Sequence, residues 1–131
     1  MSAPRRPNNS LRERVVLTHA HAQRTSTGAE VAMQANRDFR VEKISYVNDT
    51  GLAENATNFF NIEAKNGSAV VADWSTETGE DGTIAAATFV ILNLVEAERV
   101  LSAGDTLTIL FTEDGTTTLP PGKFQIEGHY L

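Results

Sequence analysis

Short runs of alternating apolar and polar residues recur along the chain, a pattern typical of β-strands. Two of these runs flank a polar Gly/Thr/Pro segment near the end of the chain, and their apolar side chains are Leu107, Ile109 and Phe111, then Phe124, Ile126 and Tyr130. Successive side chains of a strand point to opposite faces, so each set of three shares one face. Residues 107–130 therefore predict two strands that form a hairpin, and the Ala-Gly-Asp sequence at 103–105 predicts a tight turn before them.

The alternation changes parity within the strand that begins at Phe39. Phe39 and Val41 share odd positions, whereas Ile44 and Tyr46 share even positions. A single extra residue between the two pairs would bring all four side chains to the same face of the sheet. We therefore expect a β-bulge at residues 42–43.

Three further segments contribute to the strand prediction. Asn66-Gly67, at the end of the alternating run 59–65, predicts a hairpin because both residue types tolerate positive φ. Residues 83–95 carry apolar side chains in both parities and predict a mostly buried central strand. Residues 30–37 lack a helical apolar stripe, so we expect an extended segment or a single helical turn there.

The number and spacing of these runs define the expected fold class. They indicate an all-β protein, a jelly-roll-like antiparallel β-sandwich of about eight strands. A chain of 131 residues is long enough for one such domain. Residues 1–24 are expected to form an extended basic N-terminal arm and residues 25–131 the sandwich, because the first part of the arm is rich in Arg, Pro and Asn and poor in apolar side chains.

Composition narrows the classes of protein that the chain can belong to. It has 40% hydrophobic residues and no apolar run of 18 residues, so no membrane span is expected. The first residues lack the apolar core of a secretory signal. The chain contains no cysteine, which excludes disulfides, thiolate metal sites and cysteine nucleophiles.

The net charge of −6 is divided unevenly along the chain. Residues 1–43 carry 8 Arg/Lys and 4 Asp/Glu, whereas residues 44–131 carry 3 and 13. A basic arm on an acidic body is suited to contact an acidic protein surface through the arm. No direct binding of nucleic acid is expected, because the body is acidic and the basic residues are not interleaved with aromatic ones.

Three segments between Phe39 and Tyr130 resemble small virion proteins of tailed phages. They read RVEKISYVNDTG, NFFNIEAKNG and AERVLSAGDTLTILFTEDGTTTLPPGKFQIEGHY, and their order is that of strands and turns in the family. The resembling proteins are cysteine-free β-sandwiches that decorate the outside of the phage head. The resemblance covers about two-thirds of the chain and does not include residues 1–24.

The resemblance implies a structural role as a capsid decoration, or cement, protein. Such a protein binds the major capsid protein on the outer surface of the virion, stabilises the head, and forms a homo-oligomer, with a trimer favoured. We infer separately that the arm contributes to capsid binding, because guanidinium groups pair well with carboxylates. Its candidate binding residues are Arg5, Arg6, Arg12 and Arg14.

A second function class is compatible with the same fold. A carbohydrate- or receptor-binding β-sandwich module of a tail or head fibre would share these strands and turns. Trp74 and Tyr130 are candidate interface residues in either case, although a single tryptophan at a strand end is more often part of a core.

Candidate sites for chemistry are weak in this sequence. His19 and His21 share one side of a strand, but no third ligand lies nearby, so we expect no metal or other cofactor and two ordinary exposed or interface histidines. No G-x-S-x-G sequence surrounds any serine, and the acidic loop 77–81 lacks calcium-loop spacing. The protein is therefore not expected to be an enzyme.

Overall fold

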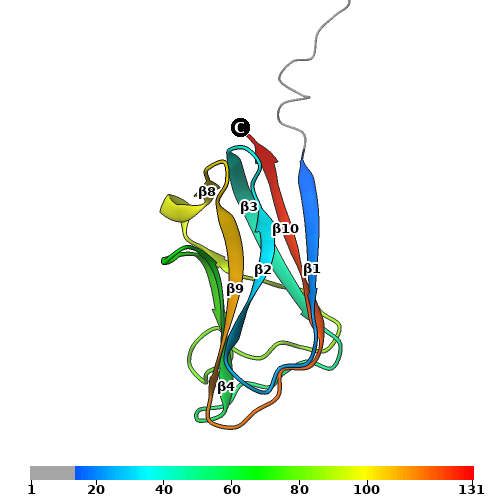
Figure 1. Ribbon diagram of the computed structural model, residues 1–131. Helices are drawn as coiled ribbons and strands as arrows, with labels where there is room; N and C mark the ends of the chain where they lie inside the picture. The colour runs from blue at the N-terminus through cyan, green and yellow to red at the C-terminus, as the bar shows by residue number, and fades with distance from the viewer. Residues whose placement is uncertain (1–13) are drawn as a thin grey trace, which may run out of the picture.

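A computed structural model describes residues 14–131, which form a sandwich of two antiparallel β-sheets (Figure 1). The strands are β1 (Val15–His21), β2 (Gly28–Gln34), β3 (Phe39–Asn48), β4 (Phe59–Asn66), β5 (Ala69–Ser75), β6 (Val90–Ile91), β7 (Asn93–Leu94), β8 (Val100–Leu101), β9 (Thr106–Asp114) and β10 (Gly122–Tyr130). A short 3₁₀ turn, η1 (Glu96–Glu98), lies between β7 and β8. The expected all-β sandwich is confirmed, with seven long strands and three of only two residues in the described chain.

Each sheet contains five strands. The first sheet has the order β1-β10-β3-β6, with β8 also paired to β3, and the second has the order β2-β9-β4-β5-β7. The pairing is nested along the chain, because β1 pairs with β10, β2 with β9, β3 with β6 and β4 with β5. β1 and β10, the first and last strands of the described residues, therefore form the outermost of these pairs.

The core lies between the two sheets and is filled by the inward side of each alternating run. Leu107, Ile109 and Phe111 on β9 are fully buried, and so are Phe124 and Ile126 on β10. The alternation predicted these inward faces correctly. Burial of each large apolar side chain contributes about 1.5–3 kcal/mol, so the paired faces provide most of the stabilisation of the sandwich.

The expected β-bulge lies on β3. Lys43 pairs with Glu127 and Val41 with Gly128, so Glu42 has no direct partner on β10. A side chain at Gly128 would meet the ring of Phe39 at 2.7 Å, which is closer than packed atoms allow. The extra residue on β3, which appears in the sequence as a change of parity, and the glycine at position 128 of β10 therefore both belong to the same β-bulge.

The hairpin predicted at Asn66-Gly67 is also present, between β4 and β5. Asn66 pairs with Ala69, so the two loop residues are Gly67 and Ser68. Gly67 has φ 63, a conformation that costs an ordinary residue about 1 kcal/mol or more. The turn is therefore centred one residue later than the sequence motif indicated.

The hairpin expected at the end of the chain is wrong. β9 belongs to the second sheet and β10 to the first, so residues 115–121 cross from one sheet to the other. Alternation identifies the buried face of a strand but not its neighbour, which is why the two runs were assigned to one hairpin. The tight turn at residues 103–105 is present, with Gly104 at φ 93.

The buried central strand expected at residues 83–95 is also wrong. This segment contains the two short strands β6 and β7, at the edges of opposite sheets, and crosses between them at Leu92. Leu92 is buried, but Phe89 and Ile91 are 46% and 57% exposed. Apolar residues at both odd and even positions are typical of a strand that is buried on both faces. Here they belong to a segment that passes from one sheet to the other.

The boundary between arm and sandwich differs from the expected one. β1 covers Val15–His21 and pairs along its whole length with β10, so these residues are part of the first sheet. The sandwich begins at Val15 instead of residue 25, because the Val-Val-Leu start of β1 provides inward apolar side chains. Residues 1–13 lie outside the described residues. Residues 28–34 form β2, so the extended alternative for that region is correct.

Two phenylalanines distinguish this architecture from the one predicted for residues 83–95. Phe124→Ala should lower the free energy of unfolding by about 3–5 kcal/mol, because it empties the centre of the core. Phe89→Ala should lower it by less than about 1 kcal/mol, because that ring is half exposed. Denaturant unfolding of both variants measures the difference. Equal losses would contradict the half-exposed position of Phe89.

Candidate functional site

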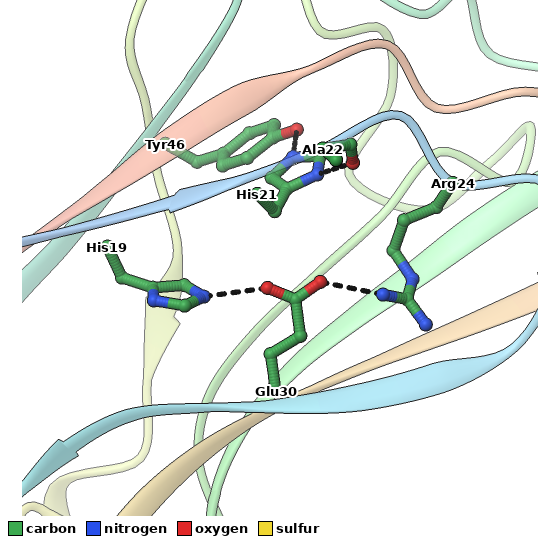
Figure 2. A network of polar contacts seen from close by, with 6 residues as sticks. All are labelled: His19, His21, Ala22, Arg24, Glu30 and Tyr46. Carbon is green, nitrogen blue, oxygen red and sulfur yellow. Dashed lines mark hydrogen bonds and ion pairs between the residues drawn. The ribbon is translucent and has the colours of Figure 1, made fainter.

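A cluster of polar side chains fills the side of the sandwich between β1 and β2, the edge strands of the two sheets (Figure 2). On β1 the residues with inward parity are Val15, Leu17, His19 and His21, so both histidines point between the sheets. His21 is 5% exposed and His19 is half-buried. The expectation that they share one side of a strand is correct. The expectation of two exposed or interface histidines is wrong for His21.

Glu30 on β2 joins the two edges of the sandwich. Its carboxylate contacts His19 Nε2 at 2.9 Å and Arg24 Nη1 at 2.6 Å. The Arg24 guanidinium lies 4.8 Å from the centre of the Phe111 ring, and a side chain at Gly28 would collide with it. Arg24 Nε is buried and has no hydrogen-bond partner among residues 14–131. The carboxylate therefore pairs with a cation whose position is fixed by packing on an aromatic ring.

His21 is part of a second set of hydrogen bonds, which crosses three strands of the first sheet. Its Nδ1 lies 2.7 Å from the carbonyl oxygen of Ala22, which can only accept, so Nδ1 carries the proton. Nε2 then accepts from the Tyr46 hydroxyl at 2.6 Å. Asn48 Nδ2 donates to the same hydroxyl oxygen at 3.1 Å and to Pro120 O at 2.6 Å. We call these hydrogen bonds among His21, Tyr46 and Asn48 the relay. Every polar group of the relay has a partner when the imidazole is neutral.

The relay passes over a glycine on the strand that lies between its members. Gly122 on β10 pairs with His21 on β1 and with Asn48 on β3. A side chain at Gly122 would lie 2.7 Å from the Tyr46 hydroxyl and 2.5 Å from the carbonyl oxygen of Val47. The absence of a side chain at residue 122 is therefore what allows β1 and β3 to be joined across β10.

Burial sets the protonation states of the relay. Desolvation is the main cause that lowers the pKa of His21. The hydrogen bond to Ala22 and the charge of Glu30 raise this pKa, whereas Arg24 and His19 lower it further. Desolvation also raises the pKa of Tyr46 above its ordinary value. Both groups are therefore neutral at pH 7. These hydrogen bonds between neutral side chains are suited to hold β1 in place.

Both histidines that could bind a metal already form hydrogen bonds within the protein. His19 bonds to Glu30, and His21 bonds to Tyr46 and Ala22. Within residues 14–131, no three or more His, Asp or Glu side chains are grouped as a metal site would require. In the same part of the chain, no helix is long and apolar enough to cross a membrane.

An open acidic depression of about 490 Å³ lies beside Trp74. Its lining includes Asp73, Glu80, Asp81 and Asn93. Asn93 Nδ2 donates to Asp81 Oδ1 at 2.7 Å, and Trp74 Nε1 donates to the carbonyl oxygen of Gly82 at 3.1 Å. The indole is packed against the core, so the depression has an aromatic side wall and polar neighbours that are already hydrogen-bonded to one another.

Arg14 and Tyr130, also singled out in the sequence, make their contacts away from the polar cluster between β1 and β2. Arg14 forms an ion pair with Glu127 at 2.8 Å, and its side chain remains 64% exposed. Arg5, Arg6 and Arg12 lie outside the described residues. Tyr130 packs edge-on against Phe39 at a centroid distance of 5.1 Å, beneath the guanidinium of Arg37.

Sequence reasoning missed Arg24, Glu30 and Tyr46 as members of one cluster. The available signal was the pair of histidines at inward positions of a strand, since buried polar side chains need partners. The partners lie on other strands, at sequence distances that alternation does not define.

No family model, curated protein or solved structure matches this chain.

The buried neutral state of His21 makes stability depend on pH. Folding lowers the pKa of His21, so the unfolded chain binds the proton more readily than the folded protein. The stabilisation contributed by neutral His21 is therefore fully present above about pH 6.5 and is lost as the pH falls through the folded-state pKa. We expect the free energy of unfolding to decrease between pH 7 and pH 5. In His21→Gln, whose amide oxygen can accept from Tyr46, this decrease should be smaller.

His19→Gln is the matched control for this pH dependence. His19 is half-buried and lies outside the Tyr46 relay, so its replacement should leave most of the decrease in place. Denaturant titrations at several pH values compare the variants. A decrease that is unchanged in His21→Gln would contradict the assignment to His21.

Proposed function

We propose that this protein is a structural component of a tailed-phage virion, a decoration or cement protein that binds the outside of the major capsid protein lattice. The observation that carries the proposal is the position of the segments with the family resemblance. They contain β4, β9, β10 and nearly all of β3, which are four of the five interior strands of the two sheets, and the short edge strand β8. The resemblance thus concerns the framework of the fold as well as its turns.

The strand pairing supports the same assignment of fold type. An eight-stranded jelly roll pairs its first strand with its last, its second with its seventh, and so on inward. The pairs β1 with β10, β2 with β9, β3 with β6 and β4 with β5 follow that scheme. A rigid sandwich with a nested topology provides fixed surfaces for many repeated weak contacts on a lattice.

The distribution of charge supports a role for the N-terminal residues in binding. Residues 14–131 carry 8 Arg/Lys and 16 Asp/Glu, a net charge of −8, whereas residues 1–13 carry three Arg and one Glu. In our proposal Arg5, Arg6 and Arg12 pair with carboxylates of the capsid surface, which sets register and association rate more than affinity. Arg14 contributes less, because it already pairs with Glu127.

A carbohydrate- or receptor-binding module of a fibre is the second candidate. The depression beside Trp74 favours it, since an aromatic wall with carboxylate and amide neighbours is suited to bind hydroxyl groups. The hydrogen bond from Trp74 to Gly82 and the packing of the indole against the core reduce the surface available for stacking on a sugar.

The capsid proposal can be tested on virions of the phage whose genome encodes this protein. Cryo-electron microscopy should show the sandwich on the outer surface of the head. In Arg5→Gln/Arg6→Gln/Arg12→Gln, binding to heads that lack the protein should weaken on the order of tenfold, because three exposed charge pairs are lost. Co-sedimentation with purified heads measures this change.

Two results would contradict these assignments separately. Unchanged binding of the triple variant would refute the role of the arm but not the location on the head. Density for the protein on a fibre, together with glycan binding that Trp74→Ala abolishes, would replace the capsid proposal by the fibre module. Arg99→Gln is a suitable control, because Arg99 pairs with Glu42 and Glu96 on the body.

A further inference from the structure

The edges of the two sheets differ in how well they are protected from pairing with another strand. At one side of the sandwich the edge strands β6, β7 and β8 contain two residues each. At the other side, β2 has an irregular register between Val31 and Met33. Short strands and bulges of this kind prevent sheets from joining edge to edge.

The free edge of β1 has none of these protections. Figure 1 shows β1 beside β10 at the outside of the first sheet. The seven residues of β1 pair with β10 without any shift of register, and the strand contains no proline or lysine. Its outward side chains are Val16, Thr18 and Ala20, all exposed and uncharged. The next strand, β10, presents Lys123, Gln125, Glu127 and His129 on the same face. Within the described chain, β1 is therefore the long, regular and uncharged edge.

We infer that β1 is a self-association site, at which the β1 strands of two copies pair antiparallel about a two-fold axis. Centring the pair on Thr18 allows all seven residues to take part over about 24 Å. Thr18 then lies opposite Thr18 of the second copy, and Val16 lies opposite its Ala20. On the outward face of the two strands, small or β-branched uncharged side chains would meet.

The place where the described chain begins favours a second copy in the antiparallel direction. Thirteen residues precede Arg14, which stands directly before the first residue of β1. In an antiparallel pair these two N-terminal segments leave from opposite ends of the shared edge, so they do not compete for space. A parallel pair would bring both segments, each with three arginines, to the same end.

This contact is independent of the proposed capsid function and gives a different assembly from the expected trimer. A two-fold contact closes on itself and produces a dimer. One pair of seven-residue strands is a small interface, so we expect association that depends on protein concentration. Because both bodies are acidic, added salt should screen their repulsion and strengthen a contact made by backbone and uncharged side chains.

Like and opposite charges at residue 18 test the register directly. Thr18→Lys and Thr18→Glu each place like charges opposite one another, so the dimerisation constant of each variant should weaken by about fivefold or more. A mixture of the two variants should recover association, because each lysine then lies opposite a glutamate. Sedimentation velocity over a range of concentrations measures the three samples and the unaltered protein.

The outcomes support or overturn the proposal. Val31→Lys and Val31→Glu, on the exposed edge of β2, are matched controls and should leave association unchanged. A trimer that is insensitive to residue 18, equal sensitivity to residue 31, or no recovery in the mixture would overturn the proposal. Association that weakens as salt is added would also overturn it and indicate binding of the basic N-terminal residues to the acidic body. Circular dichroism confirms that each variant is folded.

Discussion

Packing between two phenylalanines from opposite sheets is the contact on which the rest of the sandwich depends. The Phe111 and Phe124 rings lie 6.0 Å apart, and His21 and Tyr46 complete the cluster, 4.9 Å from Phe111 and 4.6 Å from Phe124 respectively. Three of these four residues come from the three adjacent strands of the first sheet. Their rings meet only if β1, β10 and β3 keep the register observed, so sheet register and the contact between sheets stabilise each other.

The polar cluster at the side of the sandwich follows from the same arrangement. His21 and Tyr46 are close because their rings are in the aromatic core, and their polar atoms then need partners because water is excluded. Asn48 and the backbone of Ala22 provide these partners, and Asn48 in turn donates to the carbonyl oxygen of Pro120. The protein thus uses a buried hydrogen-bond relay, and not a further apolar residue, to attach an edge strand to the centre of its sheet.

The sequence predicted the faces of the strands better than their neighbours. Leu107, Ile109, Phe111, Phe124 and Ile126 were assigned correctly to the core because alternation records burial directly. The bulge at Glu42 was predictable for the same reason, since a bulge changes parity. The assignment of β9 and β10 to one hairpin failed because a connection of seven residues can return within a sheet or cross to the other. The Arg24–Glu30–His19 contacts were not predictable, because they depend on which edges of the two sheets lie together.

Nested pairing has a consequence for the order in which the chain can fold during synthesis. Val15 pairs with Gly128, so β1 has its partner 113 positions later in the chain. β10 also separates β1 from β3, so β1 cannot join the first sheet until β10 has been synthesised. Closing such long loops makes folding slow compared with that of proteins dominated by local contacts. The nascent chain therefore carries β1 without its partner strand until residues 122–130 have been synthesised, and a premature stop before residue 122 removes the strand that joins β1 to the first sheet.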